Sequence, residues 1–160
     1  MKTMSTTTIP PKVPMDILLV EDRDDQISAV ETAIEESKLT NRMVVARRPA
    51  EALVYLRQCA SGGPLDDPEH FDRPGLILLD VNMSDKRGFD ILHDLRTDPS
   101  LMTIPVVILT DSLEEVDMGC TMAHGVTGYF LKPMDPRQLK KVIKDVEEHW
   151  TLLMTPACAN

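Results

Sequence analysis

The sequence predicts one α/β domain built on a five-stranded parallel sheet. Five short apolar runs alternate along the chain with five segments that have helical periodicity. The apolar runs are continuous rather than alternating, as expected when helices cover both faces of a parallel sheet. A chain of 160 residues without an internal repeat is long enough for one domain with its own core.

The predicted strands are short runs rich in Ile, Leu and Val. In chain order they occupy residues 15–20, 42–46, 76–79, 104–109 and 127–132. The third run, LILL, stops at a carboxylate, and an apolar pattern resumes only after a polar stretch that contains a glycine. That carboxylate therefore lies at the tip of what we expect to be a buried strand.

The predicted helices carry apolar side chains at spacings of three and four residues. The first covers residues 24–39, the second begins at Pro49, and the third is marked by Phe89, Leu92 and Leu95. The fourth runs from the capping box SLEE to Gly125. The fifth follows Asp135-Pro136 and carries one stripe of apolar residues: Leu139, Val142, Ile143, Val146 and Trp150.

The rest of the chain is expected to flank this domain. Residues 1–14, rich in Thr and Pro, are a predicted flexible lead-in, residues 15–150 are the folded domain, and residues 151–160 are a tail. The tail keeps Leu152, Leu153 and Met154 together, which indicates either a homodimer contact or a segment that folds back on its own domain.

Composition excludes several classes of partner. The net charge of −9 argues against a nucleic-acid surface and against an anionic membrane face. The chain has no apolar run of membrane-spanning length and no apolar signal core near its N-terminus. Its three scattered cysteines form no CxxC pair and are typical of a cytoplasmic protein.

Polar residues gather where the predicted strands end. In an open parallel sheet the carboxyl ends of the strands share one rim, and that rim is where ligands bind. Three acids, a hydroxyl and a lysine are expected there: Glu21, Asp22, Asp80, Thr110 and Lys132.

This set of residues suits metal-assisted phosphoryl chemistry. Three carboxylates in one place repel each other unless a cation joins them. With oxygen ligands and no nearby His or Cys, Mg²⁺ is the expected ion. Lys132 and Thr110 suit the oxygens of a phosphoryl group, and a carboxylate can itself act as nucleophile and form an acyl phosphate. Asp80, on the central strand, is the expected nucleophile.

Each of these residues also has an ordinary structural explanation. Asp80 could be a strand-end carboxylate, and Glu21 with Asp22 could cap the first helix. Thr110 could be a β-branched strand residue, and Lys132 a solvated charge at a sheet edge. Their joint position at one rim favours a shared functional site.

In this order the segments resemble the receiver domain of bacterial two-component response regulators, with similarity from about Asp16 to Trp150. The resemblance implies a flavodoxin-like, doubly wound (βα)5 fold. It implies that LLVEDRDD supplies Glu21 and Asp22 to a Mg²⁺ site, and that Asp80 in LILLDVNM accepts the phosphoryl group. Asn82 would offer its backbone carbonyl to the metal.

The resemblance also implies roles for the last two strands. Thr110 in PVVILT would be the switch hydroxyl, and Lys132 in GYFLKP would be the lysine that the family carries in its phosphorylation site. Tyr129 would be the aromatic switch, although it could also be a half-buried packing residue. Two departures from the family pattern, Ser84 and Arg87, affect the loop beside the phosphoacceptor rather than the chemistry.

Finer features resemble the small stand-alone regulators that pair with bacterial and cyanobacterial phytochrome kinases. These features are the long loop before the third strand, the segment DPSLMTIPVVILTDS, and a Trp closing the last helix. The resemblance implies a sensor histidine kinase, such as a bacteriophytochrome, as partner. It also implies output through the face formed by the fourth helix, fifth strand and fifth helix, where a homodimer could form together with the tail.

Two other functions fit parts of the pattern. A phosphohydrolase using an aspartyl-phosphate intermediate needs a second acid two residues after the nucleophile, and Asn82 stands there. A nucleotide or flavin binder needs a Gly-rich phosphate loop after the first strand, where this chain has EDRDDQ. A phosphorylation-gated binding module, not a conventional enzyme, is therefore the preferred interpretation.

Asp111 is unusual, because the position after the switch Thr is normally small in the family. Its side chain either places a negative charge at the mouth of the phosphoacceptor pocket or caps the fourth helix. The sequence leaves these two alternatives open.

Overall fold

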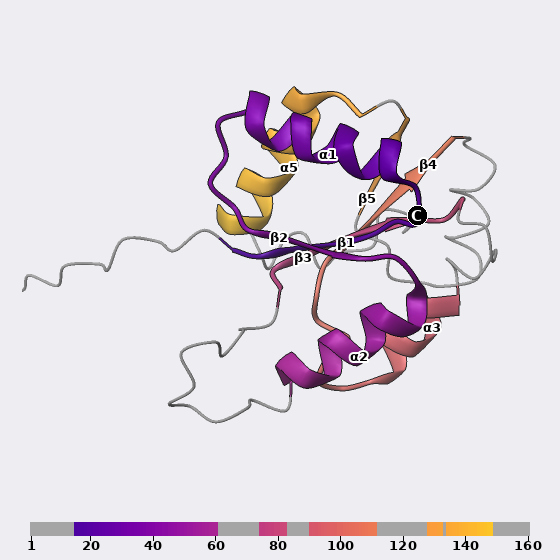
Figure 1. The fold of residues 1–160 in the computed structure, drawn as a ribbon. Coiled ribbons are helices and arrows are strands. Elements are labelled where there is room, and N and C mark those ends of the chain that lie inside the picture. The colour runs from indigo at the N-terminus through magenta and orange to yellow at the C-terminus, as the bar shows by residue number, and fades with distance from the viewer. Residues whose placement is uncertain (1–14, 61–73, 83–89, 112–127, 133, 149–160) are drawn as a thin grey trace, which may run out of the picture.

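The computed structural model describes residues 15–60, 74–82, 90–111, 128–132 and 134–148. They form the predicted α/β fold: a single parallel sheet with the strand order β2-β1-β3-β4-β5 (Figure 1). The strands are β1 (Ile17–Val20), β2 (Met43–Ala46), β3 (Leu76–Asp80), β4 (Val106–Thr110) and β5 (Gly128–Leu131).

Helices cover the two faces of this sheet. Those in the described residues are α1 (Asp24–Glu36), α2 (Pro49–Ala60), α3 (Asp90–Thr97) and α5 (Pro136–Glu148). Figure 1 shows α1 and α5 on one side of the sheet and α2 and α3 on the other. The predicted fourth helix lies outside the described residues. No described helix has the length and apolarity needed to span a membrane.

The strand order explains why the rim residues meet. All four strand pairings are parallel, so every carboxyl end points to the same edge of the sheet. The chain crosses from β1 out to β2 and then back to β3 on the other side of β1. The crevice outside this reversal is where open α/β sheets bind ligands, and β1 and β3 both end there.

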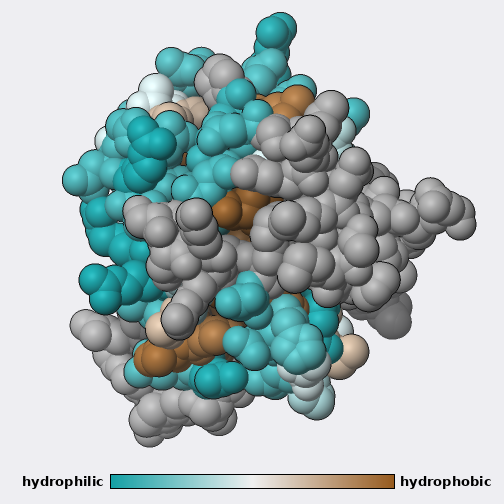
Figure 2. Space-filling model, turned by 90° about the vertical axis from the view of Figure 1, so that its right-hand side faces the viewer, coloured by the Kyte–Doolittle hydropathy of each residue, from teal (hydrophilic) through white to brown (hydrophobic). Residues whose placement is uncertain are grey.

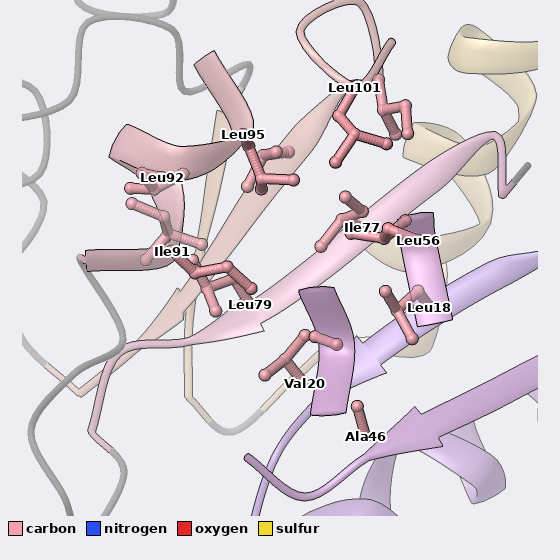
Figure 3. Close-up of a cluster of buried hydrophobic side chains, with 14 of the residues drawn as sticks. Leu18, Val20, Ala46, Leu56, Ile77, Leu79, Ile91, Leu92, Leu95 and Leu101 are labelled. Carbon is pink, nitrogen blue, oxygen red and sulfur yellow. The ribbon is translucent and has the colours of Figure 1, made fainter. Parts of the chain in front are cut away.

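The core consists of two apolar layers, one on each face of the sheet. Successive strand residues point to opposite faces, so Leu18 and Ile77 join the layer under α2 and α3 (Figure 3). Leu19 and Leu78 join the layer under α1 and α5 instead. Because both faces are filled, β1, β3 and β4 are buried along their whole length.

The expectation of strands buried on both faces is wrong for β5. Tyr129 and Leu131 are exposed, and Phe130 between them is buried. The strand therefore alternates between an exposed and a buried face. β5 lies at the edge of the sheet with a partner strand on one side, so its continuous apolar run is not a sign of complete burial.

The first helix ends earlier than its periodicity predicts. It stops at Glu36, and Lys38 adopts a left-handed backbone with φ of 57°. The N–H of Leu39 then donates to the carbonyl of Ile34 at 3.1 Å, a bond that satisfies a carbonyl at the helix end. Leu39 packs on the core beside α1, which explains why it continues the apolar pattern without being helical.

The strands also differ from their predicted ranges by one or two residues at their ends, and the differences in β3 and β4 are the most informative. β3 extends one residue further and includes Asp80, whose side chain is fully buried. β4 begins at Val106 rather than at Ile104. Pro105 has no N–H to donate to a ladder, although its carbonyl still accepts the N–H of Ile77 at 2.9 Å.

Candidate functional site

The structure brings the rim residues of β1, β3 and β5 into contact. Glu21 follows β1, Asp80 ends β3, and Lys132 follows β5. The Nζ atom of Lys132 lies 3.0 Å from Oδ1 of Asp80 and 3.7 Å from Oε2 of Glu21. Strand alternation explains this grouping, because each residue continues the series that faces α1 and α5.

Asp80 uses its two carboxylate oxygens differently. Oδ1 accepts a hydrogen bond from the backbone N–H of Asn82 at 2.8 Å, in addition to its contact with Lys132. Oδ2 is buried and accepts no hydrogen bond in the described part of the chain. A buried carboxylate oxygen without a donor is costly, so Oδ2 is the oxygen suited to contact a cation or a reacting group.

Glu21 is held by the turn that leads into α1. Its Oε1 accepts the backbone N–H groups of Asp22 and Arg23, each at 3.1 Å. The residue at the N-cap position of α1 is Arg23, and it makes no side-chain capping bond. Glu21 therefore stabilises the turn with one oxygen and points the other towards Lys132.

Burial makes ionised Glu21 unfavourable. Removal from water raises the pKa of Glu21 to about 8, and the neighbouring Asp80 carboxylate acts in the same direction. Hydrogen bonding to the Arg23 backbone and the charge of Lys132 oppose this rise. Without a cation, the site thus holds a proton on Glu21 at neutral pH.

Lys132 is not the solvated edge charge of the alternative explanation. Its side chain is 11% exposed, and both carboxylates that it contacts are fully buried. One lysine cannot neutralise two buried acids and a neighbouring third. The electrostatics of the site therefore favour a further positive charge.

The three acids meet the requirement for a divalent metal site. Glu21, Asp22 and Asp80 each place a carboxylate oxygen within 4.8 Å of the other two. Oε2 of Glu21 and Oδ2 of Asp80 are buried and receive no hydrogen bond from the described residues. Such hard oxygen ligands suit Mg²⁺, which binds one or two carboxylates and keeps several waters. The donor set fits the ion predicted from the sequence.

Thr110 approaches the site from the neighbouring strand. It ends β4 and is fully buried, and its carbonyl accepts the backbone N–H of Lys132 at 2.9 Å. In the alternation of β4, Thr110 follows Ile108, which belongs to the layer under α2 and α3. Thr110 and Lys132 are thus on opposite sides of the sheet rim beside Asp80.

Tyr129 lies away from this cluster. It is 45% exposed, so it is about half buried, as the alternative of a packing residue expects. Its role as a switch stays a prediction. Ser84, Arg87 and Gly88, which follow the phosphoacceptor in the predicted motif, lie outside the described residues.

A cavity of about 300 Å³ opens beside the acids. Glu21, Lys132 and Asp111 contribute its polar wall, and α1 and β5 contribute apolar side chains such as Val30 and Phe130. Figure 2 views the molecule from the carboxyl ends of the strands, and most of the coloured surface there is hydrophilic around small apolar areas. Asp111 is exposed and lines this cavity, as the electrostatic alternative requires.

One contact of the site was not predicted from the sequence. The side-chain oxygen of Asn82 accepts the backbone N–H of Asp111 at 3.1 Å. These residues are 29 positions apart, and nothing in either local sequence indicates that they meet. The available signal was that Asp111 directly follows β4 and Asn82 comes two residues after the end of β3, and that β3 and β4 are neighbours.

Comparison with known protein families gives a match over most of the chain. Residues 17–144 match the family described as the response regulator receiver domain. The response regulator Rcp1 of Synechocystis sp. is 32% identical over 152 residues, which cover 95% of this chain and 97% of Rcp1. A solved Mn²⁺-bound form of Rcp1 aligns with a TM-score of 0.60 and 31% identity over 86% of this chain and 94% of that one.

Two further solved structures are similar over most of their length. The bacteriophytochrome response regulator RtBRR aligns with a TM-score of 0.71 and 34% identity, covering 86% of this chain and 81% of that chain. The phosphorylated cyanobacterial phytochrome response regulator RcpA aligns with a TM-score of 0.64 and 32% identity. That alignment covers 92% of this chain and 98% of RcpA.

Proposed function

The chain belongs to the response regulator receiver domain family, and on that premise we propose that Asp80 is its phosphoacceptor. A carboxylate oxygen of Asp80 attacks the phosphorus of a phosphohistidine on a sensor histidine kinase. The histidine N–P bond breaks, an O–P bond forms to Asp80, and the electron pair returns to the imidazole nitrogen. Hydrolysis of the acyl phosphate later restores the carboxylate.

The observation that carries this proposal is the asymmetry of the Asp80 carboxylate. The Asn82 N–H and Lys132 Nζ both contact Oδ1, at 2.8 and 3.0 Å, and so fix the plane of the group. Oδ2 accepts no hydrogen bond from the described residues and is the oxygen available for metal binding or attack. A nucleophile held in this way needs little reorganisation before it reacts.

The metal site would be formed by Glu21, Asp22, Asp80 and the backbone carbonyl of Asn82. Mg²⁺ held there would supply positive charge to phosphoryl oxygens and reduce the repulsion between an incoming phosphoryl group and the acids. The close approach of the three carboxylates supports this assignment.

Lys132 and Thr110 would bind the phosphoryl group once it is on Asp80. The ammonium of Lys132, 3.0 Å from Oδ1, can shift to a phosphoryl oxygen nearby without leaving its buried position. The Thr110 hydroxyl would approach from the other side of the rim. Movement of Thr110 would then be transmitted along β4 and β5 to Tyr129, which lies two register positions from the Thr110 partner Leu131 on the neighbouring strand.

The proposed output is a change in a protein-binding surface. Tyr129 and Leu131 on β5 are 45% and 42% exposed and provide an apolar part of such a surface. A homodimer through the fourth helix, β5 and α5, together with the tail, is one form that this output could take. The fourth helix and the tail lie outside the described residues.

The similarity to regulators named for phytochromes supports a phytochrome-type histidine kinase as the partner. A receiver that exchanges phosphoryl groups with such a kinase would act in the cytoplasm. Neither a nucleic acid nor a membrane is proposed as a direct partner, because the net charge is −9.

The protein would catalyse its own phosphorylation and dephosphorylation, and it would not turn over an external phosphate ester. In the competing phosphohydrolase reaction, a second acid located two residues after the nucleophile would protonate the leaving group. Asn82 has no acidic proton, and its side-chain oxygen already accepts a bond from Asp111.

The direct test is incubation with Mg²⁺ and acetyl phosphate, followed by intact-mass measurement and mapping of the modified peptide. We expect one phosphoryl group per chain, located on Asp80 and removed by hydroxylamine, which cleaves acyl phosphates. Labelling at another residue would reject the assignment. Repeated turnover of acetyl phosphate or an external phosphate ester, without a long-lived adduct, would favour the phosphohydrolase.

A further inference from the structure

Asn82 makes a side-chain contact that its predicted role as a backbone metal ligand does not explain. Its Oδ1 accepts the backbone N–H of Asp111 at 3.1 Å. Asp111 is exposed, so water could satisfy the same N–H. The bond is therefore not needed to rescue a buried donor, and its effect is to join the segment after β3 to the segment after β4.

This contact continues the pairing of the two central strands beyond their ends. Asp80 is paired with Leu109 in the β3–β4 register, and the N–H of Val81 donates to the carbonyl of Leu109 at 3.2 Å. The next link between the two segments is the bond from Asp111 to the Asn82 side chain. The side chain thus replaces a backbone acceptor at the point where the two strands separate.

A second bond acts on the same peptide group. The peptide between Thr110 and Asp111 donates its N–H to Asn82 and accepts the N–H of Lys132 at its carbonyl, at 2.9 Å. A peptide group is planar and rigid, so these bonds fix Asn82 and Lys132 relative to each other across β4. Both residues also contact Oδ1 of Asp80.

The contacts close into a ring. It runs from Oδ1 of Asp80 to the backbone N–H of Asn82, through the Asn82 side chain to the 110–111 peptide, on to the backbone of Lys132, and through Nζ back to Oδ1. Three of the four links use backbone groups or the side chain of Lys132, which the family resemblance already predicted. The Asn82 side chain is the link that depends on the identity of a residue outside the predicted chemistry.

We propose that the Asn82 side chain is a positioning residue for phosphoryl transfer to Asp80, an inference that rests on the proposed function. By closing the ring, it keeps both donors on Oδ1 and leaves Oδ2 facing the metal and the phosphodonor. It also anchors the backbone of Thr110, whose hydroxyl must reach the phosphoryl group. Removing it loosens the geometry without removing any group that touches the phosphorus.

The first measurement tests the bond itself and requires no phosphorylation. Asn82→Ala removes the acceptor and keeps the backbone N–H that binds Asp80, whereas Asn82→Asp keeps an oxygen at the same position. Hydrogen exchange of the Asp111 amide is followed by NMR in metal-free protein. We expect exchange to be about ten-fold faster in Asn82→Ala and close to wild type in Asn82→Asp. Asp111→Ala keeps its own amide and serves as the matched control with normal protection.

The second measurement tests the consequence for chemistry. With saturating Mg²⁺, the maximal rate of phosphorylation by acetyl phosphate is expected to fall about ten-fold in Asn82→Ala. The concentration of acetyl phosphate that gives half the maximal rate is expected to stay unchanged. Asn82→Ser, whose oxygen is on a shorter side chain, is expected to behave like Asn82→Ala. Thermal unfolding of each variant reports that the fold is retained.

The outcomes separate this inference from the proposed function. An unprotected Asp111 amide in the wild type, or an unchanged maximal rate in Asn82→Ala, overturns the positioning role while leaving Asp80 as phosphoacceptor. A wild-type protein that takes no phosphoryl group rejects the proposed function and, with it, this inference. Faster amide exchange together with a slower maximal rate supports the inference.

Discussion

The central strands and the edge strand β5 have similar apolar sequences but different environments. Every residue of β3 and β4 is buried, including Asp80 and Thr110 at their carboxyl ends. In β5, Phe130 is buried and its neighbours Tyr129 and Leu131 are exposed. The difference comes from position in the sheet, because β4 has a strand on both sides and β5 has one.

This difference separates two tasks. Burial at the centre removes water from Asp80 and strengthens its contact with Lys132, which suits a site that must hold charge in a fixed arrangement. Exposure at the edge leaves Tyr129 and Leu131 available to another protein. Lys132 directly follows β5, so one short segment connects the buried chemistry to the exposed surface.

The largest expected effect comes from a pair of substitutions, one in each region. Asp80→Asn should abolish phosphorylation, because the amide is close to isosteric but not nucleophilic. Tyr129→Ala should leave the extent of phosphorylation within about two-fold of wild type, because the side chain points away from the acids. Intact-mass measurement after incubation with acetyl phosphate and Mg²⁺ checks both. Equal labelling of Asp80→Asn and wild type would contradict the assignment of the phosphoacceptor.

A matched pair of leucines compares the stability of the two regions. Leu79 in β3 is 0% exposed, whereas Leu131 in β5 is 42% exposed. Leu79→Ala is expected to lower the free energy of unfolding by about 3 kcal/mol through lost burial and a cavity. Leu131→Ala should lower it by less than about 1 kcal/mol. Urea denaturation of the two variants measures the difference, and similar losses would show that β5 is covered in solution by a partner or a second copy.

The metal site gives a smaller effect that is confined to the centre. Asp22→Ala removes one carboxylate of the acidic cluster and should weaken Mg²⁺ binding by about ten-fold or more. Isothermal titration calorimetry with Mg²⁺ measures the change in affinity. A normal titration in this variant would show that the metal is held elsewhere.

The same titration should depend on pH. The pKa of Glu21 is raised to about 8 in the metal-free protein, so this side chain is mostly protonated at neutral pH. Mg²⁺ must displace that proton, and its apparent affinity should therefore increase as the pH rises from 6 towards 8. Glu21→Gln, which binds no such proton, should flatten the dependence between these values as a control.

The smallest expected effect concerns Asp111. It lines the cavity beside Glu21 and Lys132, and its charge would repel the phosphoryl group on Asp80. Asp111→Ala is expected to raise the phosphorylated fraction several-fold, equivalent to about 1 kcal/mol, and most strongly at low salt. An unchanged fraction together with a lower melting temperature would instead identify Asp111 as a helix cap.

The sequence predicted the fold class and the order of its elements because apolar periodicity is a local property. Continuous apolar runs identified the strands, and spacings of three and four identified the helices. It was less accurate where tertiary context overrides the pattern. Leu39 continues the apolar series of α1 but packs beyond its end. The left-handed residue that ends the helix is Lys38 rather than a glycine, so the sequence gives no signal of this turn.

The rim residues could also be predicted from the sequence, because a parallel sheet places all carboxyl ends at one edge. Glu21, Asp80 and Lys132 were grouped for that reason, and the structure brings them into contact. Their individual roles stay predictions that the proposed experiments test.

The tertiary structure alone decided the details that depend on distance and burial. It determined that Oδ1 of Asp80, not Oδ2, contacts Lys132 and the Asn82 amide, and that the Asn82 side chain reaches Asp111. It also determined that β5 is exposed on one face. Local sequence specifies which residues form a strand, but neighbours across the sheet come from distant parts of the chain, so their contacts follow only from strand order, register and packing.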